Sequence, residues 1–391
     1  MTAERPEVDR LSRVMAAALL TSVCLLPFML MPYLIGAVAL AVTPDSRQLG
    51  FVAAAVLGGP IVLMAVSMTW VRRYPWRRLV FWGLVVAALG YLLAAGMHNF
   101  ATLLASIAVG SSALAIAYAP PICALSDTSN PDRNFGYAFF LQIIVCGLVG
   151  LGATALQNRF GPRSLFVLIA AVFACSLCLL LWLPEAGVKH EARSLAEPRP
   201  AVSRIWMGLA GMLLLNAGPT AVWAFFERIG RGEGFAEQSV GNMIALALLI
   251  GAPGSLLSAL AARRYGRIRP LALSTVLLIV TFGMAINAHN PSTFLIAGAV
   301  FQLLLNFSLA FQYGALSVAD RSGRLIVLAP TFQGIGGIAG PVVAGMAVRG
   351  DSYVVVAGLS GLYEIIGLVL MIGLCRQGAS ASAELASTTP R

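Results

Sequence analysis

Charge is the scarcest property of this sequence. Only 11% of its 391 residues are Asp, Glu, Lys or Arg, whereas soluble domains carry about 25%. A fold of this size surrounded by water is therefore excluded. Hydrophobic residues instead make up 59% of the chain, in long runs close to the roughly 20 residues that a helix needs to cross a bilayer. The composition predicts an all-α membrane protein with many spans.

Lysine and nucleotide-binding sequences are also scarce. Lys189 is the only lysine, and the arginines behind the formal net charge of +10 lie in short connections between apolar runs. A nucleic-acid-binding protein gathers its basic residues on one face of a soluble domain, so we expect no nucleic-acid partner. The sequence also contains no glycine-rich loop followed by Lys-Ser or Lys-Thr, which is the phosphate-binding signature of ATPases. This argues against transport driven directly by ATP.

Residues that carry catalysis or bind metals are few and scattered. All six cysteines lie in apolar segments, and Cys175-x-x-Cys178 has no histidine nearby, which favours apolar packing over redox chemistry. His98 and His289 lie in the stretches MHNFAT and AHNPST, where the asparagine indicates a turn. We therefore expect no catalytic residue, no metal site and no cofactor.

Apolar runs bounded by charges, glycine and proline predict twelve transmembrane helices. We expect an N-terminal six-helix bundle over 1–184, a cytoplasmic linker over 185–204, a C-terminal six-helix bundle over 205–376 and a disordered tail over 377–391. The expected spans are 14–42, 48–70, 79–97, 101–125, 136–157, 164–183, 205–227, 239–262, 270–288, 293–318, 325–348 and 353–375.

The arginine-rich connections indicate the orientation. When alternate connections are assigned to two sides, one side collects 20 of the 26 Lys and Arg residues, and that side includes both termini, the loop VRRYPWRRL and the central linker. The positive-inside rule places this side in the cytoplasm. We therefore expect a monomeric, multi-pass protein of the bacterial cytoplasmic membrane, embedded in lipid, with both termini cytoplasmic.

The two halves of the sequence resemble each other at an offset of 191 residues. Polar matches are hard to obtain by chance in an apolar sequence. Since each half has six expected spans, the halves have the same orientation and form two parallel repeats. The matching polar positions include Arg72-Arg73-Tyr74 with Arg263-Arg264-Tyr265, His98-Asn99 with His289-Asn290, and Gln142 with Gln333.

This organisation resembles the major facilitator superfamily over essentially the whole chain. That family has twelve spans in two repeats, and its loops after helices 2 and 8 carry the signature Gly-x-x-x-Asp-Arg-x-Gly-Arg. The stretch ALAARRYGR matches the signature at Arg264, Gly266 and Arg267, while Arg263 replaces the acid; the first copy matches at Arg73. The resemblance implies a carrier, similar to members that export drugs or metabolites.

A second stretch resembles the Gly-x-x-x-Gly-Pro antiporter sequence of the same family. It runs from Gly336 to Pro341, in the eleventh expected span, whereas the family has it in helix 5. Small residues at this spacing also let two helices approach closely. A tight helix contact is therefore the alternative reading.

Polar side chains at membrane depth are costly, so we expect them to face a cavity or another helix. Asn216, Thr220, Trp223 and Glu227 are spaced four, three and four apart and therefore share one helix face. In the resembling family, helices 1, 4, 7 and 10 line the central cavity. Hydrogen bonding between helices is the alternative role. The residues that we expect in a substrate cavity are Asn216, Thr220, Trp223, Gln302, Asn306, Tyr313, Gln333, Gln142, Tyr118 and Phe28.

Two acidic residues are candidates for proton coupling. Glu364 lies in the middle of the twelfth expected span, where a carboxyl group can bind and release a proton. The alternative is a protonated structural acid, because helix 12 is usually peripheral in the resembling family. Glu227 ends the seventh span beside Arg228. It is a candidate for gating or for proton entry, and the alternative is that it is a solvated residue at a helix end.

Charged residues near the cytoplasmic helix ends are candidates for a gate that closes this side. The alternative is that they are solvated and bind lipid headgroups. The expected gate residues are Arg72, Arg73, Arg263, Arg264, Asp127, Arg133, Asp320 and Arg324.

The distribution of charge also limits the substrate. No basic residue lies inside an expected span, which argues against phosphates and multiply charged anions. We expect a secondary active transporter that exports a small neutral, cationic or lipophilic organic molecule by alternating access, coupled to protons. Uptake of a small organic nutrient is the alternative. A membrane enzyme or a receptor is the alternative from another class, although GASASAELASTTPR is short for a signalling tail.

Overall fold

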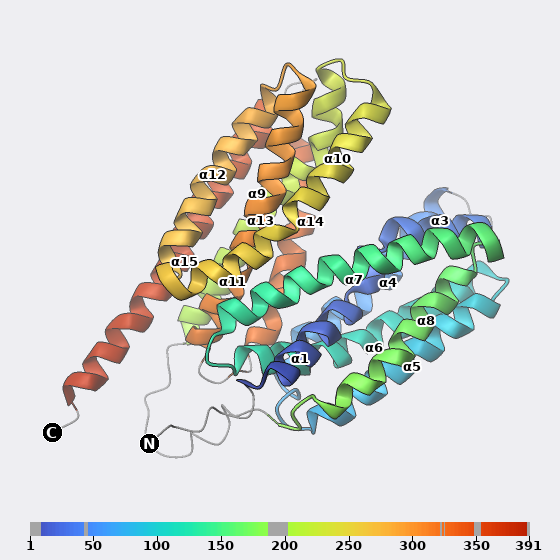
Figure 1. Ribbon diagram of the computed structural model, residues 1–391, viewed down its shortest axis with the longest axis horizontal. Coiled ribbons are helices and arrows are strands. Elements are labelled where there is room, and N and C mark those ends of the chain that lie inside the picture. The colour runs from blue at the N-terminus through green and yellow to red at the C-terminus, as the bar shows by residue number, and fades with distance from the viewer. Residues whose placement is uncertain are drawn as a thin grey trace. The chain divides into compact units, whose positions relative to one another are not determined.

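The computed structural model describes residues 9–42, 46–186, 202–320, 323, 325–347 and 353–388, and Figure 1 shows their helices. These residues contain no strand, which confirms the expected all-α fold. The helices are α1 (Leu11–Cys24), α2 (Leu26–Met29), α3 (Met31–Val42), α4 (Ser46–Ser67), α5 (Trp76–Gly96), α6 (Phe100–Ser126), α7 (Pro131–Phe160), α8 (Ser164–Ser176), the 3-10 helix η2 (Leu177–Leu181), α9 (Val202–Gly232), α10 (Glu237–Gly251), α11 (Pro253–Tyr265), α12 (Ile268–Ile286), α13 (Pro291–Ala319), the 3-10 helix η4 (Ile326–Leu328), α14 (Ala329–Ala347) and α15 (Val354–Thr388).

Nine helices in the described part of the chain are long and apolar enough to cross a membrane. The expected first and eighth spans are divided between shorter helices, whereas the second is occupied by α4, a helix of 22 residues. The prediction of one unbroken helix over 14–42 is wrong, because α1, α2 and α3 share that stretch. Pro27 lies in the first turn of α2, and a proline cannot donate the backbone hydrogen bond that would continue α1.

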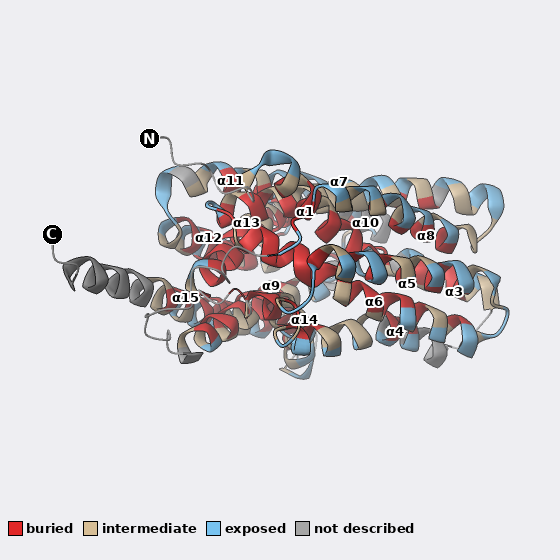
Figure 2. Cartoon of the chain, turned by 90° about the horizontal axis from the view of Figure 1, so that it is seen from below, coloured by how far each residue is buried: buried red, intermediate tan, exposed pale blue. Residues whose placement is uncertain are grey.

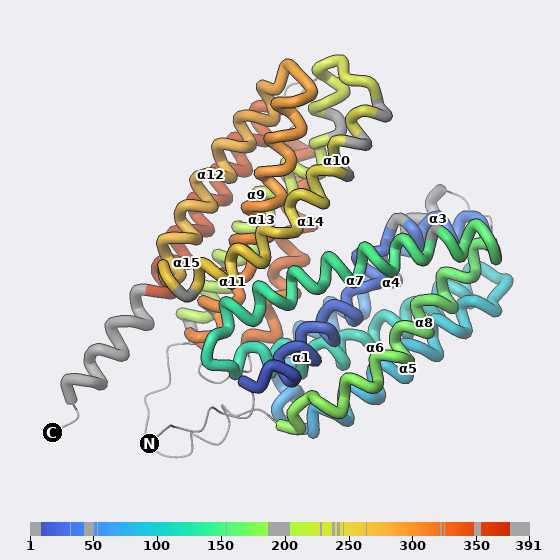
Figure 3. The backbone as a smooth tube through the Cα atoms, in the orientation of Figure 1, coloured from blue at the N-terminus to red at the C-terminus, as the bar shows by residue number. Residues whose placement is uncertain are grey.

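The expected eighth span is also interrupted. Residues 239–262 divide between α10 and α11 at Ala252, and Pro253 begins α11. Proline is favoured in the first turn of a helix and disfavoured inside one. Figure 3 traces the chain through this break. The last helix, in contrast, continues to Thr388, through part of the stretch expected as a tail, where alanine, leucine and glutamate favour helix.

The described structure forms two compact units. The first unit comprises residues 1–129, 141–194 and 322–328, and the second comprises 130–140, 195–321 and 329–391. In the first unit α6 packs against α5, α4 and α1, and α8 packs against α5. In the second unit α9 packs against α14 and α15, while α10, α11 and α12 pack against α13.

Small residues allow the closest helix contacts. On α5, a Cβ at Gly90 would lie 2.8 Å from the Cα of Gly110 on α6. On α14, a Cβ at Gly336 or Gly340 would meet the backbone of α9. The antiporter-like stretch thus forms the tight helix contact that was its alternative reading.

The repeated asparagines begin corresponding helices. Asn99 accepts a hydrogen bond from the backbone N–H of Ala101 at the start of α6, over 2.8 Å. Asn290 accepts one from Thr293 at the start of α13, also over 2.8 Å. These are N-cap bonds, which satisfy a backbone donor that the helix leaves free. They confirm that the His-Asn stretches belong to turns.

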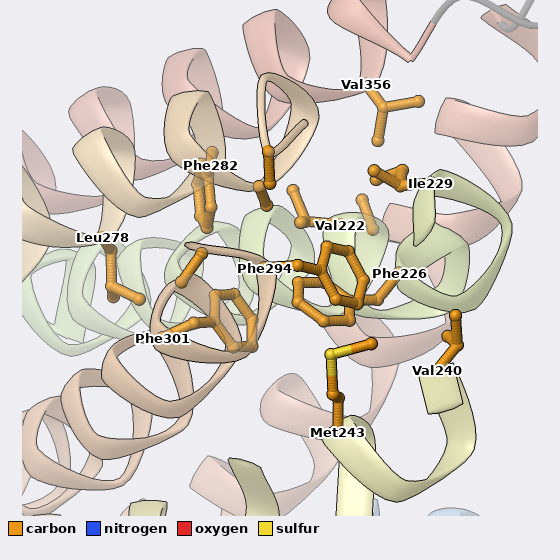
Figure 4. Packing of buried hydrophobic residues seen from close by; sticks show 14 of the residues in the cluster. Val222, Phe226, Ile229, Val240, Met243, Leu278, Phe282, Phe294, Phe301 and Val356 are labelled. Carbon is orange, nitrogen blue, oxygen red and sulfur yellow. The ribbon is translucent and has the colours of Figure 1, made fainter. Parts of the chain in front are cut away.

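Exposed residues lie on the outer faces of the described helices (Figure 2), and many of them are large and apolar. On α5, Trp82, Leu89 and Leu93 are more than half exposed, whereas Gly83 and Ala87 are buried. An apolar outer face is the pattern expected of helices surrounded by lipid tails. An apolar core of the second unit includes Phe226 of α9 together with Phe294 and Phe301 of α13 (Figure 4).

Candidate functional site

The polar face of α9 contacts α13 inside the second unit. Asn216 is 4% exposed, and its amide donates hydrogen bonds to the Met212 carbonyl over 2.7 Å and to the Gln312 side-chain oxygen over 3.1 Å. Thr220 donates to the Asn216 carbonyl over 2.6 Å. Asn216 therefore joins the two helices, and Gln312 is a partner that the expected site did not include.

Trp223 lies one turn further along the same face of α9. Its ring stacks on Phe301 of α13 with a centroid distance of 5.5 Å and an interplanar angle of 4°, and on Phe226 at 5.2 Å. Trp223 remains partly exposed, whereas Phe226 and Phe301 are buried. The indole is thus held in one orientation by its neighbours, with part of its surface free for contact.

Two polar residues of α13 lie at the break between α10 and α11. The Asn306 amide donates to the Gly251 carbonyl over 3.3 Å, which is one of the carbonyls left unbonded where α10 ends. Gln302 is 6% exposed and lies against Gly251. The structure therefore assigns Asn306 a bond that supports the broken helix.

Tyr313 is enclosed by aromatic side chains. It is 1% exposed, its hydroxyl donates to the Gln333 side-chain oxygen over 2.8 Å, and its ring lies 5.1 Å from the rings of Phe135 and Phe139. Phe135 and Phe139 come from the first turns of α7, which belong to the second unit. Tyr313 and Gln333 thus form a pair that links α13 to α14.

The expected cavity residues of the first unit are more dispersed. Tyr118 of α6 is buried, Gln142 of α7 is half-buried, and Phe28 of the short α2 is 45% exposed. Sequence spacing brought Asn216, Thr220 and Trp223 together correctly. The structure groups Gln302 with Asn306, and Tyr313 with Gln333, as two further sets in the second unit.

Glu364 is the acidic residue buried within a candidate span of the second unit. It lies on α15, is 1% exposed, and neither carboxyl oxygen has a hydrogen-bond partner in the described structure. The helix α9 passes directly beside it, since a Cβ at Gly218 would lie 3.5 Å from the Glu364 Oε1 atom. The side chain of Glu227, the second expected coupling residue, lies outside the described residues.

Arg72 is the best-connected of the expected gate residues. Its guanidinium binds both carboxyl oxygens of Asp127 over 2.9 and 2.7 Å, and its Nε donates to the Gly323 carbonyl over 2.8 Å. It also lies over the Trp76 ring at 5.5 Å. We call Arg72, Asp127, Gly323 and Trp76 the Arg72 node, which lies entirely within the first unit.

A second ion pair was not expected from the sequence. Arg267 binds Asp132 over 2.7 Å in the second unit, and Asp132 lies in the first turn of α7. Arg267 is one of the matches to the family loop signature, and Asp132 directly precedes Arg133 in the sequence. No pattern in the sequence connected the two, because 135 residues separate them.

The remaining gate residues have separate surroundings. Arg73 and Arg264 are exposed, and Arg264 lies over the Tyr265 ring. Arg133 donates to Asn134 over 3.2 Å, and Asp320 is buried. Arg324 and the side chain of Arg263 lie outside the described residues. The candidate gate therefore centres on Arg72 and Asp127, with Arg267 and Asp132 as the counterpart in the second unit.

Comparisons with known proteins identify the fold independently. Residues 14–341 match the family model of the Major Facilitator Superfamily. No curated protein matches the sequence. The chain is 14% identical to the transporter FucP in its outward conformation, covering 94% of this chain and 99% of FucP with a TM-score of 0.75. It is 13% identical to the proton:xylose symporter XylE, over 93% and 96% of the two chains with a TM-score of 0.72. It is 15% identical to the human organic anion transporter MFSD10, over 95% and 100% with a TM-score of 0.68.

Proposed function

Because the chain belongs to the major facilitator superfamily, and because the matching structures are transporters, we propose that it exports a small neutral, cationic or lipophilic organic molecule by alternating access. We propose protons as the coupling ion, and a bacterial cytoplasmic membrane with both termini in the cytoplasm as the location. The transporter works as a monomer in this proposal.

The observation that carries the proposal is the polar and aromatic face of α9. Asn216, Thr220 and Trp223 follow one another along this face, and each is held by a hydrogen bond or a stacked ring. A partly exposed tryptophan supports binding of a flat or amphipathic molecule, because its ring offers apolar area and its indole N–H can donate a hydrogen bond. A preorganised face also lowers the entropic cost of binding.

The arrangement of basic residues supports the proposed substrate class. Within the described candidate spans of the second unit, Arg204 and Arg269 are the basic residues, and both lie at a helix start. Recognition of phosphates or multiply charged anions uses arginine or lysine at the site. The described spans thus favour a substrate that needs no buried positive partner.

Uptake of a small organic nutrient is the second candidate. It is favoured by the similarity to FucP and XylE, which are named as proton symporters of fucose and xylose. FucP and XylE are 13 to 14% identical to this chain, so their similarity supports the fold alone.

The substrate face is tested by ligand stabilisation of the purified protein, followed by flux in proteoliposomes. We expect Trp223→Ala to weaken binding of any stabilising compound by roughly tenfold, because a stacked aromatic contact contributes on the order of 1 kcal/mol beyond its buried area. The matched control is Trp206→Ala on the same helix, whose ring is 42% exposed and contacts Phe332. Equal effects of both variants would move the substrate site away from this face.

Proton coupling is tested by imposing a pH gradient on the same proteoliposomes. We expect the gradient to drive substrate flux in the unaltered protein, and Glu364→Gln to abolish that response while substrate exchange at equal pH continues. The physical reason is that glutamine keeps the shape of the side chain but cannot carry a proton. Wild-type flux that ignores the gradient would contradict proton coupling.

A further inference from the structure

Four buried side-chain oxygen atoms without a hydrogen-bond partner among the described residues lie at and beside Glu364. The Glu364 Oε1 and Oε2 atoms, the Thr275 hydroxyl and the Ser360 hydroxyl are buried and have no hydrogen-bond partner in the described structure. The residues themselves are 1%, 1% and 0% exposed. Buried polar atoms almost always have a partner, so a group of three unpaired side chains in one region requires an explanation.

The three side chains come together from two helices. Ser360 and Glu364 are four residues apart on α15, so they occupy the same helix face one turn apart. The Thr275 hydroxyl of α12 lies close enough to the Glu364 carboxyl group for a weak interaction that falls outside ordinary hydrogen-bond geometry. A Cβ at Gly361 would lie 3.6 Å from Ile279, one turn beyond Thr275 on α12. The two helices therefore pack with these polar groups between them. We call Thr275, Ser360 and Glu364 the oxygen cluster.

A third helix closes the cluster on the remaining side. A Cβ at Gly218 of α9 would lie 2.8 Å from the Ser360 carbonyl and 3.4 Å from the Glu364 Cγ atom. Glycine at this position brings the α9 backbone against the cluster without filling the space beside the carboxyl group. The cluster is thus enclosed by α9, α12 and α15 of the second unit.

Neighbouring hydroxyl groups behave differently. Ser274 donates to the Leu271 carbonyl over 2.9 Å, Thr281 to the Leu278 carbonyl over 2.7 Å, and Thr220 to the Asn216 carbonyl over 2.6 Å. Bonds of this kind to the preceding turn are the usual way in which a helix satisfies a buried hydroxyl group. Thr275 and Ser360 lack such a bond, as do Ser255 and Thr331 elsewhere in the second unit, but Thr275 and Ser360 are the two that lie beside the buried Glu364 carboxyl group.

The described candidate spans of the second unit offer the cluster no positive partner at the depth of Glu364. The candidate spans of the second unit are 204–226, 268–286, 291–319, 326–347 and 354–375. Apart from Glu364, their charged residues are Arg204 and Arg269, at the first and second positions of their spans, and Arg269 is exposed. The titratable side chains on these spans besides Glu364 are Tyr313, Tyr363 and Cys375. None of these is a basic group that could neutralise the carboxylate.

We propose that the oxygen cluster is a binding site for a sodium ion. One carboxylate and two hydroxyl groups supply four oxygen atoms, which are the hard ligands that sodium, like magnesium and calcium, requires. A single negative charge matches a monovalent ion, whereas calcium sites gather several carboxylates. The ion supplies a positive charge beside Glu364, whereas the arginines of the described candidate spans, Arg204 and Arg269, lie at helix starts.

The sodium site depends on the proposed function only for its link to transport. Sodium binding at these residues does not itself require that function. A sodium ion and a proton would occupy the same carboxyl group and therefore exclude each other. Binding of either one would neutralise Glu364 and change the packing of α15 against α9 and α12. The site lies among helices of one unit. Gly218, which lines it, is two residues from Asn216 on α9 and therefore lies on a different face of that helix.

The binding test uses the purified full-length protein and sodium-22. We expect saturable sodium-22 binding that unlabelled sodium displaces and choline does not, and a higher melting temperature in sodium chloride than in choline chloride at equal ionic strength. Glu364→Gln should abolish both effects. Thr275→Val and Ser360→Ala should each weaken sodium binding by roughly tenfold.

Two control variants on α12, the helix that carries Thr275, make the test specific. Ser274→Ala and Thr281→Val remove hydroxyl groups that bond to their own helix, so they should leave sodium binding unchanged. The proposal is overturned if the wild-type protein binds no sodium-22, or if the two sets of variants behave alike. Because Thr275→Val and Ser360→Ala keep the carboxylate, they also test the cluster should Glu364→Gln fail to fold.

The sodium site and the proposed function can fail separately. If sodium-22 does not bind but a pH gradient drives substrate flux, the sodium site is wrong and proton coupling stands. If sodium-22 binds and neither a sodium nor a pH gradient drives flux, the site stands and the coupling role is wrong.

Discussion

Arg72 shows how much a single side chain can connect. Its planar guanidinium group binds Asp127 with two parallel hydrogen bonds and still has its Nε donor for the Gly323 carbonyl. The pair is almost fully buried, with side-chain exposures of 2% for Arg72 and 0% for Asp127. A lysine cannot reproduce this planar arrangement of donors. The node therefore depends on arginine, and not on positive charge alone.

At the residue scale we predict that Asp127→Asn destabilises the protein far more than loss of a surface pair. Removing one partner of a buried ion pair costs about 3 to 5 kcal/mol, because the other charge remains buried. The control is Glu185→Gln, which removes the exposed pair with Arg77, with exposures of 39% and 72%; such pairs contribute about 0 to 1 kcal/mol. Thermal unfolding measures both. Equal shifts in melting temperature would contradict the burial argument.

Small residues decide which helices can touch. Gly336 and Gly340 bring α14 against the α9 backbone, whereas a Cβ at Gly334, on the same helix, would meet no atom within 4 Å. Glycine costs a helix roughly 0.5 to 1 kcal/mol relative to alanine. The contact with α9 therefore explains why position 340 is glycine, whereas no contact explains the glycine at position 334.

At the element scale we predict opposite signs for two identical substitutions. Gly340→Ala should lower the melting temperature, because the added methyl group meets the Ala217 backbone. Gly334→Ala should leave it unchanged or raise it, because alanine is the better helix former and the space is open. Thermal unfolding of both variants in the same detergent provides the measurement. Stabilisation by Gly340→Ala would show that α9 and α14 do not pack this closely.

The sequence predicted the positions of most helices because apolar runs of the right length are separated by charges. It could not predict the breaks at Pro27 and Pro253, since the apolar pattern continues across both. On α9 the spacing of Asn216, Thr220 and Trp223 was sufficient, because helix geometry alone puts them on one face. The partners Gln312, Phe301 and Arg267 were missed, since only tertiary packing brings them near.

The whole chain divides into two units that do not follow the halves of the sequence. Residues 130–140 belong to the second unit and residues 322–328 to the first. The first turns of α7 are held in the second unit by the Asp132–Arg267 pair and by Phe135 and Phe139 around Tyr313. The helix α7 therefore begins in one unit and continues in the other.

At the scale of the molecule we predict that Asp132→Asn releases the start of α7. A cysteine introduced as Phe139→Cys in a cysteine-free background should react with a soluble maleimide about fivefold faster when Asp132→Asn is added, as expected for a shift of about 1 kcal/mol. The control is Arg133→Gln in the same background, since Arg133 bonds only to its neighbour Asn134 among the contacts described above. Equal rates of maleimide reaction with and without Asp132→Asn would show that Asp132 does not hold the start of α7.

The Arg72 node also constrains how sequences of this kind can diverge. Gly323 has a φ of +59°, and a Cβ at this position would collide with the Arg72 guanidinium group. A side chain at position 323 fits only if Arg72 is replaced by a shorter residue. Such a residue can no longer donate a hydrogen bond to the backbone carbonyl of residue 323. Positions 72 and 323 should therefore covary among orthologues, although 251 residues separate them along the chain.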